Sequence, residues 1–280
     1  MRSTVHSDVA AFASLAMPFF GRDPVRHTSA LSAVSGLRRG GAESALVTAH
    51  DEGRLRAVLP WTRPLPVPVS GVPVEASRVV ATAVAEMTTA LGAVNGPRAE
   101  AEAFVSAWTG LTGASVTGDR TMILYELGEL SDPRPVPGLF RFATSDEVDL
   151  VARWRRDFAA EALPWQPEDP DPAGTAATVI TERTCGLWCV GGTPVATAQA
   201  SRPECGMARI SYVYTPPEHR GRGYGAAVSA AISRHLRHAG VAHVVLYADQ
   251  ANPTSNALYQ RLGYRRILDF ANLPLTPPTG

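Results

Sequence analysis

The chain has 280 residues, enough for one large domain or two of ordinary size, and 45% of them are apolar, so it can bury a sizeable core. Lys+Arg and Asp+Glu both number 26, which gives a formal net charge of zero. This balance argues against nucleic-acid or anionic-membrane partners, and no apolar stretch approaches the length of a membrane span.

The cysteines and the N-terminus restrict the class of protein further. Cys185, Cys189 and Cys205 have neither the number nor the spacing of a disulfide framework or a zinc site. The apolar run after Asp8 lacks a long uninterrupted core and a clear cleavage site, so we interpret residues 8–17 as a first helix rather than a signal peptide. We therefore expect a cytoplasmic protein without a bound metal.

The first half of the chain continues with a predicted hairpin. Asp51, Glu52 and Gly53 provide turn chemistry between two apolar runs. The proline-alternating segment after it is expected to be extended, with Leu65, Val67 and Val69 on one face. Two helices and a strand are then expected at about 75–91, 98–108 and 120–127.

A domain boundary is predicted at residues 128–140. Prolines 133, 135 and 137 fit neither a helix interior nor a central strand. The chain is thereby divided into an expected first domain, 1–132, and an expected second domain, 138–280.

The second half repeats the pattern of the first. The elements expected here are an amphipathic helix at 148–162, a loop at 164–174, a hairpin at 186–201 turning at Gly191 and Gly192, a strand at 207–215, a glycine-rich loop with a helix, a strand at 240–249, a short helix at 252–264 and a strand at 265–273. Both halves thus follow the order helix, hairpin, strand, helix, strand, helix, strand, which predicts a duplicated α/β unit.

The glycine-rich loop, TPPEHRGRGYGAA, is the strongest functional signal in the sequence. It joins a predicted strand to the start of a helix, where unpaired amides and the helix dipole favour an anion. Glycines let the backbone approach phosphate oxygens closely. A pyrophosphate is therefore the expected ligand.

Two coenzymes carry such a group. Gly221, Gly223 and Ala226 fit the dinucleotide pattern G-x-G-x-x-A, and Asp249 ends the next strand, where a ribose-binding acid belongs. Against a dinucleotide, PPEHR separates the glycines from the strand, and too little chain follows Asp249 for a second nucleotide-binding half.

The same loop also fits R-x-x-G-x-G, at Arg220, Gly223 and Gly225. With the strand ISYVYT before it and NPTSNALYQRLGY after it, residues 138–273 resemble the GNAT family of acetyl-CoA-dependent N-acetyltransferases. The resemblance implies an α/β fold of tandem GNAT-like domains, each a mixed, mostly antiparallel sheet flanked by helices. The first domain is similar to a degenerate copy that lacks the coenzyme loop.

The resemblance also implies which residues bind acetyl-CoA as cosubstrate. Backbone groups of the strand end would hold the pantetheine arm, amides of the loop would hold the pyrophosphate, and two asparagines on the following helix often contact the coenzyme. In this chain these are Val213, Tyr214, Thr215, Arg220, Gly221, Arg222, Gly223, Tyr224, Gly225, Ala226, Asn252 and Asn256. For Asn252, which precedes Pro253, an ordinary helix N-cap is an equal alternative.

For catalysis, the resemblance implies that Tyr259 is the general acid that protonates the departing thiolate, the alternative being a core tyrosine. Histone-type members carry a glutamate base where this chain has Arg209, so the base is open. Glu161 on the first helix of the second domain is the first candidate, and Glu204, Ser211 and His219 are others.

The acceptor is expected to be the primary amine of a small molecule or peptide, attacked directly without an acyl-enzyme. Aromatic residues that could line its site are Trp154, Phe158, Trp165, Tyr212 and Tyr214. Two alternatives stay open: a non-catalytic acyl-CoA-binding or regulatory module, and a tandem GNAT enzyme with a cysteine-conjugate acceptor, as in mycothiol synthase. The oligomeric state, monomer or homodimer, is open as well.

Overall fold

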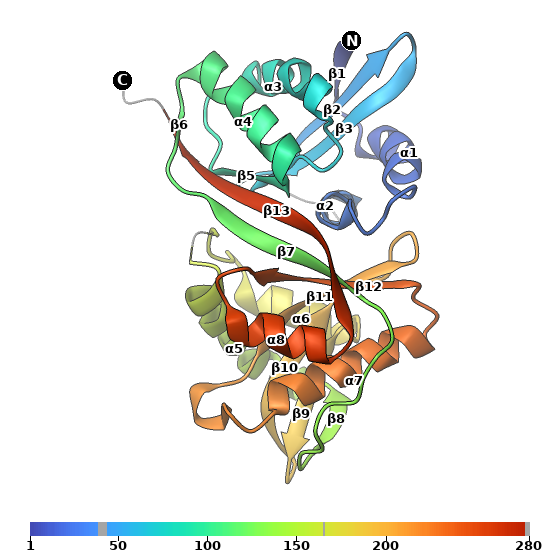
Figure 1. Cartoon of the computed structure of the whole chain (residues 1–280), viewed down its shortest axis with the longest axis vertical. Coiled ribbons are helices and arrows are strands. Elements are labelled where there is room, and N and C mark those ends of the chain that lie inside the picture. The colour runs from blue at the N-terminus through green and yellow to red at the C-terminus, as the bar shows by residue number, and fades with distance from the viewer. Residues whose placement is uncertain (39–43, 165, 278–280) are drawn as a thin grey trace. The chain divides into compact units, whose positions relative to one another are not determined.

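A computed structural model describes residues 1–38, 44–164 and 166–277, and its secondary structure repeats one order of elements twice (Figure 1). Each copy runs strand, two helices, three strands, helix, strand, helix, strand. The first copy contains β1 (Arg2–His6), α1 (Val9–Phe20), α2 (Thr28–Arg38), β2 (Ser44–Asp51), β3 (Arg54–Thr62), β4 (Val67–Pro68), α3 (Ser77–Ala85), β5 (Ala93–Pro97), α4 (Arg98–Thr112) and β7 (Arg120–Leu127), with a short β6 (Ser115–Val116) before the last strand.

The second copy contains β8 (Leu139–Phe142), α5 (Val148–Ala162), α6 (Pro172–Thr181), β9 (Cys185–Val190), β10 (Thr193–Ala200), β11 (Met207–Tyr214), α7 (Tyr224–His238), β12 (His243–Asp249), α8 (Pro253–Arg261) and β13 (Tyr264–Thr276). The repeat agrees with the predicted duplication. The sequence-based order lacked the leading strand and the second helix, and it lacked them in both copies.

The chain forms two compact units that are not contiguous halves. Unit 1 comprises residues 1–123 and 268–280, and unit 2 comprises residues 124–267. The division therefore falls within β7 and within β13, rather than at the proline segment. The division into a first domain, 1–132, and a second domain, 138–280, stays a prediction.

Unit 1 has an antiparallel meander and a small mixed sheet. Strands β1, β2 and β3 pair in that order, and the turn between β2 and β3 holds Glu52 and Gly53 at φ of 48° and 76°, as a tight hairpin requires. In the small sheet, β5 pairs in parallel with β4 and antiparallel with the end of β13.

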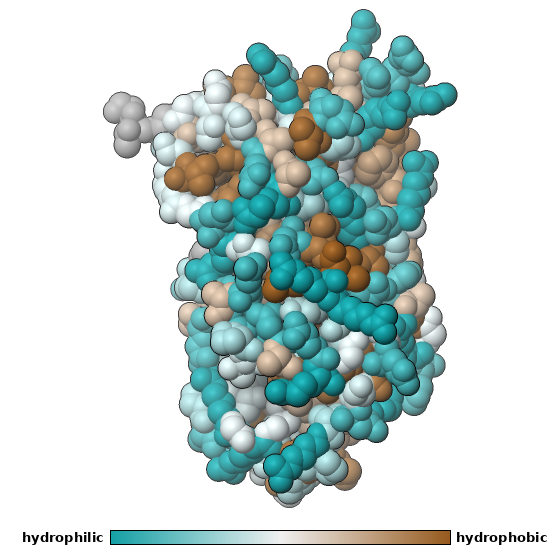
Figure 2. Space-filling model, viewed as in Figure 1, coloured by the Kyte–Doolittle hydropathy of each residue, from teal (hydrophilic) through white to brown (hydrophobic). Residues whose placement is uncertain are grey.

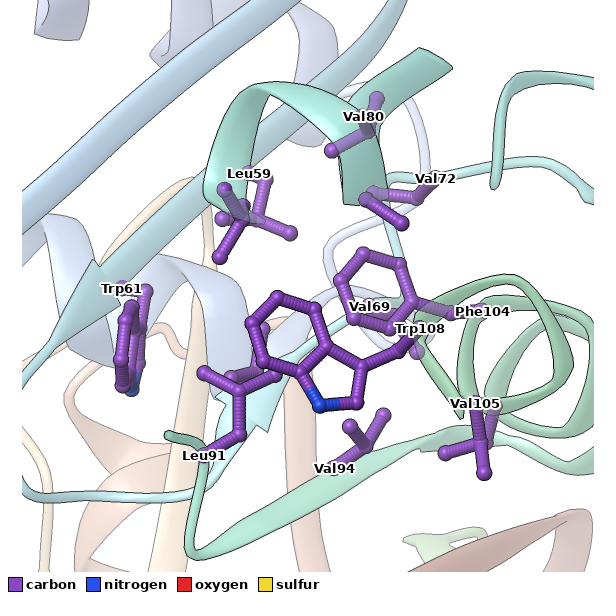
Figure 3. Close-up of a cluster of buried hydrophobic side chains, with 14 of the residues drawn as sticks. Leu59, Trp61, Val69, Val72, Val80, Leu91, Val94, Phe104, Val105 and Trp108 are labelled. Carbon is purple, nitrogen blue, oxygen red and sulfur yellow. The ribbon is translucent and has the colours of Figure 1, made fainter. Parts of the chain in front are cut away.

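The core of unit 1 lies between its strands and the helices α3 and α4. The indole of Trp108 is fully buried there among Leu91, Val94 and Phe104 (Figure 3). Ala271, Leu273 and Leu275 of β13 belong to the same cluster. The C-terminal strand is thus part of the unit 1 core.

Three expectations for unit 1 need correction. Leu65 does not share the buried face of Val67 and Val69; it is 49% exposed, because the two-residue strand β4 begins only at Val67. The helix expected at 75–91 is shorter, since α3 ends at Ala85. The helix α2 was not expected at all.

Unit 2 carries a mixed sheet that is mostly antiparallel. Strands β8, β9, β10 and β11 pair antiparallel in that order, and β11 pairs in parallel with β12. Gly191 and Gly192 adopt φ of 56° and 83° in the turn between β9 and β10, as predicted. The helices α5 and α6 cover the buried cluster of this sheet around Trp154 and Leu187.

The loop expected at 164–174 ends earlier than predicted. Asp171 caps α6, because its Oδ1 accepts a hydrogen bond from the amide of Gly174 at 2.9 Å, and Pro172 occupies the first helical position. The acidic, proline-rich segment at 164–174 thus contains the start of a helix, although its composition is typical of a loop.

The surface seen in Figure 2 is mostly hydrophilic, with hydrophobic residues in small groups. Across the described residues, no helix combines the length and apolar character needed to cross a membrane. Within the same residues, no group of three or more His, Cys, Asp and Glu side chains is placed to hold a metal ion.

One buried histidine makes the stability of unit 1 dependent on pH. His27 is 8% exposed, lies against the rings of Phe19 and Phe20, and its Nδ1 is 3.2 Å from Ser70 Oγ. Burial lowers the pKa of His27 from 6.5 to about 4. The unfolded chain therefore binds a proton between these values that the folded protein does not bind.

This histidine gives the first prediction. The stability that it contributes is complete above pH 6.5 and is lost as the pH falls from 6.5 to 4, by about 3 kcal/mol for a shift of this size. Urea unfolding of the wild type and of His27→Gln at several pH values measures it. The wild-type free energy of unfolding should fall more steeply across this window than that of the variant; parallel curves would contradict the assignment.

Candidate active site

An extra residue in β11 shapes the site. Gln199 of β10 pairs with Ser211, but Thr197, two residues before Gln199, pairs with Tyr214, three residues after Ser211. Tyr212 takes up the extra length at a φ of 49°, a left-handed conformation that is costly for a bulky residue. The strand bends at this bulge, directly before the glycine loop.

Beyond the bulge, β11 and β12 separate. Their parallel register joins Met207–Ile210 to His243–Leu246, and both strands continue past it to Tyr214 and Asp249. On the side facing β12, the backbone groups of β11 after Ile210 are consequently unpaired within the sheet. An extended ligand with amide groups can hydrogen-bond to Val213 and Tyr214 there.

The glycine loop then forms an uncapped helix start. Gly221 and Gly223 have φ of 73° and 85°, and no side chain caps Gly223, the N-cap of α7. The first amide bonded along the helix is that of Ala227, which donates to the carbonyl of Gly223 at 3.1 Å. The amides of 224–226 therefore have no acceptor within the helix, which is the arrangement that binds phosphate.

The side chain of Arg220 is used within the protein. Its Nε donates to the carbonyl of Thr215 at 2.9 Å, and one terminal nitrogen donates to both carboxylate oxygens of Glu161 at 2.9 and 2.7 Å. Tyr214 Oη lies 3.5 Å from the same carboxylate. The ion pair of Arg220 with Glu161 thus joins the loop to helix α5.

The neighbouring loop residues differ in accessibility. Arg222 is exposed, so its guanidinium is free to reach an anion, whereas Tyr224 is buried beneath the loop. A Cβ on Gly225 would lie 3.4 Å from Thr215 Oγ1. Arg222 is thus an exposed cationic side chain between Gly221 and Gly223 of the loop.

The two predicted asparagines serve α8 in this structure. Asn252 caps the helix through a 3.0 Å bond from the amide of Ser255. Asn256 accepts from Tyr125 Oη at 3.0 Å and donates to the carbonyls of Asp249 and Asn252 at 2.9 and 2.7 Å. Their contact with a coenzyme stays a prediction, and it would have to replace or supplement these bonds.

Tyr259 lies on α8 and is 8% exposed. Its ring meets that of Tyr264 edge-on at a centroid distance of 5.8 Å. Burial raises the pKa of Tyr259 far above its ordinary value, so the phenol keeps its proton throughout the physiological range. It can supply a proton but cannot act as a base there.

The remaining candidates for a base have other surroundings. Glu204 bonds through its backbone to Met207, and Ser211 faces Gln199 across the sheet. His219 has a buried Nδ1 without a hydrogen-bond partner in the described part of the chain. None of these contacts brings the side chains of the three candidates together.

The predicted aromatic residues partly converge. The rings of Phe158 and Tyr212 are 5.1 Å apart, and those of Trp154 and Tyr214 are 6.4 Å apart. Trp165 lies outside the described residues. Sequence reasoning missed Arg155, whose guanidinium stacks 3.9 Å from the centre of the Tyr212 ring. Its helical position three residues before Phe158 was the available signal, since it places both on one side of α5.

Comparison with known proteins agrees with this geometry. Residues 149–264 match the model of the acetyltransferase (GNAT) family. This part of the chain, which includes the glycine loop, is thus similar to that family. The mostly antiparallel sheet of unit 2 also argues against the dinucleotide-binding fold, whose sheet is mostly parallel.

Two solved structures share the fold over nearly the whole chain. An acetyltransferase of the GNAT family from Colwellia psychrerythraea has a TM-score of 0.63 at 10% identity and covers 99% of this chain and 100% of its own. A GNAT-type N-acetyltransferase from Sphaerobacter thermophilus has a TM-score of 0.62 at 16% identity, with 100% and 96% covered. Both likenesses concern the fold of the chain.

Curated relatives are similar over part of their length. A mycothiol acetyltransferase of Thermobispora bispora is 36% identical over 155 residues, 49% of this chain and 51% of its own. Another, of a Parafrankia strain, is 35% identical over 164 residues, 54% and 48% respectively. The match thus spans about half the length of these relatives.

The glycine loop gives the second prediction. Gly221 and Gly240 have similar φ, 73° and 81°, and open space where a Cβ would lie, so replacing either by alanine should cost about 1 kcal/mol of stability. Only Gly221→Ala also places a methyl group in the phosphate loop. Calorimetric titration should show acetyl-CoA affinity about tenfold weaker or more for Gly221→Ala, and unchanged for Gly240→Ala.

NADH is the control ligand in the same titration. The wild type should bind acetyl-CoA and not NADH. Equal acetyl-CoA affinities of the two variants would contradict the binding of the coenzyme at this loop. Binding of NADH alone would favour the dinucleotide hypothesis.

Proposed function

We propose that the protein is an N-acetyltransferase that moves the acetyl group of acetyl-CoA to a primary amine. The observation that carries this proposal is the bulged, separated end of β11 followed by the uncapped, glycine-lined start of α7. Together they offer unpaired backbone groups to an amide-containing arm and free amides to a pyrophosphate.

The chain's residues fit such a cosubstrate. Val213, Tyr214 and Thr215 would bind the pantetheine arm, and the amides from Arg220 to Ala226 would bind the pyrophosphate. The exposed guanidinium of Arg222 adds a charge for a phosphate. The cosubstrate supplies an acetyl thioester as the acyl donor.

The transfer is a direct displacement. The amine nitrogen attacks the thioester carbonyl, the C–N bond forms, and the C–S bond breaks from the tetrahedral intermediate. Tyr259 donates its phenolic proton to the departing sulfur; because burial raises the pKa of Tyr259, the phenol is protonated at neutral pH. A backbone amide of β11 meets the oxyanion.

Glu161 is a candidate base with a competing role. A base must take the proton of the attacking ammonium, yet both carboxylate oxygens of Glu161 accept from Arg220. Taking a proton would weaken that ion pair and release the loop from α5. The contacts favour a positioning role, in which Glu161 holds Arg220 and thereby the loop.

A second acceptor class is favoured by the curated relatives. Both are named mycothiol acetyltransferases, which supports a cysteine-conjugate acceptor for this protein too. The remaining alternative is a non-catalytic acyl-CoA-binding module. A screen of amines with thiol detection separates them, because turnover of any amine excludes the non-catalytic module.

Tyr259→Phe is the third prediction. Removing the phenolic proton should lower turnover about 100-fold or more and leave acetyl-CoA affinity nearly unchanged. Tyr264→Phe is the matched control, since it removes an equally buried hydroxyl that bonds Ser233 Oγ at 2.7 Å. The control should lose about 1 kcal/mol of stability and keep its turnover. A fully active Tyr259→Phe enzyme would refute the acid assignment.

Glu161→Gln is the fourth prediction. If Glu161 positions the loop, the variant should raise the KM for acetyl-CoA and change kcat little, because glutamine cannot hold Arg220 by charge. Arg220→Gln removes the other partner and should have the same effect. Steady-state kinetics on both variants measures it. A large loss of kcat in Glu161→Gln alone, with loss of the acidic limb of the pH profile, would instead make Glu161 the base.

A further inference from the structure

Arg209 is a cation in unusual surroundings. It lies on β11, half-buried, with its guanidinium 5.8 Å from the centre of the Tyr247 ring. Among the described residues, no carboxylate lies within ion-pair distance of it. Burial accordingly lowers the pKa of Arg209, although arginine keeps its charge.

The sheet register places Arg209 beside other residues of the candidate site. Arg209 is two residues from Ser211, so their side chains share one face, and Ser211 pairs with Gln199, whose side chain is on that face too. This face carries α5, since Arg155 of that helix donates a hydrogen bond to Gln199 Oε1. Arg209 therefore projects to the helix side of the bulge.

Tyr212 connects two arginines there. Arg155 stacks on its ring at 3.9 Å, and electrostatic interaction with Tyr212 opposes the lowering of the pKa of Arg209 by burial. Arg155 already has partners, Gln199 and, at 3.7 Å, Asp169. The Arg209 side chain, by contrast, has five N–H donors and no hydrogen-bond acceptor among the described residues. We call Arg155, Gln199, Arg209, Tyr212 and Tyr247 the arginine–tyrosine cluster.

A half-buried guanidinium without a carboxylate is costly unless something else supplies the negative charge. Aromatic faces help, but a single cation–π contact is weaker than a charge-assisted bond to an oxyanion. The cluster adjoins the bulge, where the acceptor amine must reach the thioester. The missing anion is thus best supplied by the acceptor itself.

We propose that Arg209 binds an oxyanion of the acceptor, so that the substrate is a primary amine that also carries a carboxylate or a phosphate. The proposal rests on the N-acetyltransferase function proposed above and names its substrate class. Arg209 is a specificity residue because it pairs with the charged end of the acceptor. Tyr212 and Arg155 keep the side chains around it in position. Lysine would serve less well, because it lacks the planar two-donor fork.

Matched amines test this in the presence of acetyl-CoA. The pairs are L-amino acids with their amides, and phosphoethanolamine with ethanolamine. Wild-type kcat/KM should favour the oxyanion member of at least one series about tenfold or more, with the two series distinguishing carboxylate from phosphate. Arg209→Gln should abolish the preference, and Arg209→Lys should retain part of it. Arg153→Gln, an exposed arginine of the same helix as Arg155, should leave it intact.

A binding measurement keeps the two proposals separable. In the presence of coenzyme A, the arginine Nε–Hε resonances of the labelled protein are followed while the same amines are added, and the Arg209 signal is assigned from its absence in Arg209→Lys. The oxyanion members should shift that signal and their neutral partners should not. This measurement does not require turnover. An inactive protein that still shows the shift would therefore refute the N-acetyltransferase proposal and leave the Arg209 proposal standing.

The outcomes that overturn the Arg209 proposal are definite. They are equal use of charged and neutral amines, an oxyanion preference that survives in Arg209→Gln, or an Arg209 signal that no oxyanion-bearing amine moves. Acetyl-CoA titration of each variant verifies that it is folded and binds the coenzyme.

Discussion

A single extra residue in β11 is the constraint on which the candidate site depends. Because the bulge at Tyr212 turns the strand, β11 leaves β12 after Ile210 and its backbone is free to bind an extended ligand. The same bulge presents Tyr212 to Arg155 and sets the direction in which the chain enters the loop before α7. A regular strand would pair with β12 to its end and close the site. The strained left-handed conformation of Tyr212 therefore lies at the position where the strand has to bend.

Charge within the site follows from how the arginines are paired. Arg220 forms an ion pair with Glu161, so the side chain that begins the R-x-x-G-x-G pattern has a structural role. Arg155 has Asp169 nearby. Arg222 and Arg209 have no such partner in the described structure, one at the phosphate loop and one at the helix side of the bulge. By our proposals, Arg222 would face the phosphates of the coenzyme and Arg209 the anionic group of the acceptor.

Much of the fold was predictable because its signals are local. The helix at 148–162, the Gly191–Gly192 hairpin and the glycine loop were each expected where the structure has them, since periodicity and turn chemistry act over a few residues. The short first strand and the helices α2 and α6 were missed, as proline and small residues weaken their patterns. The site was harder. Motif spacing located the loop, but the Glu161–Arg220 pair joins residues 59 positions apart, and no local pattern encodes such a contact.

The discontinuity of unit 1 has a consequence for how the protein is made. The core of unit 1 includes Ala271, Leu273 and Leu275 of β13, so unit 1 cannot complete its core until the segment that follows unit 2 in the sequence has been synthesised. The part of the protein that begins first is thus the part that is completed last. Until β13 pairs with β5, the apolar side chains that cluster with Ala271, Leu273 and Leu275 lack part of their cover, and incompletely covered apolar surface of this kind is prone to aggregation.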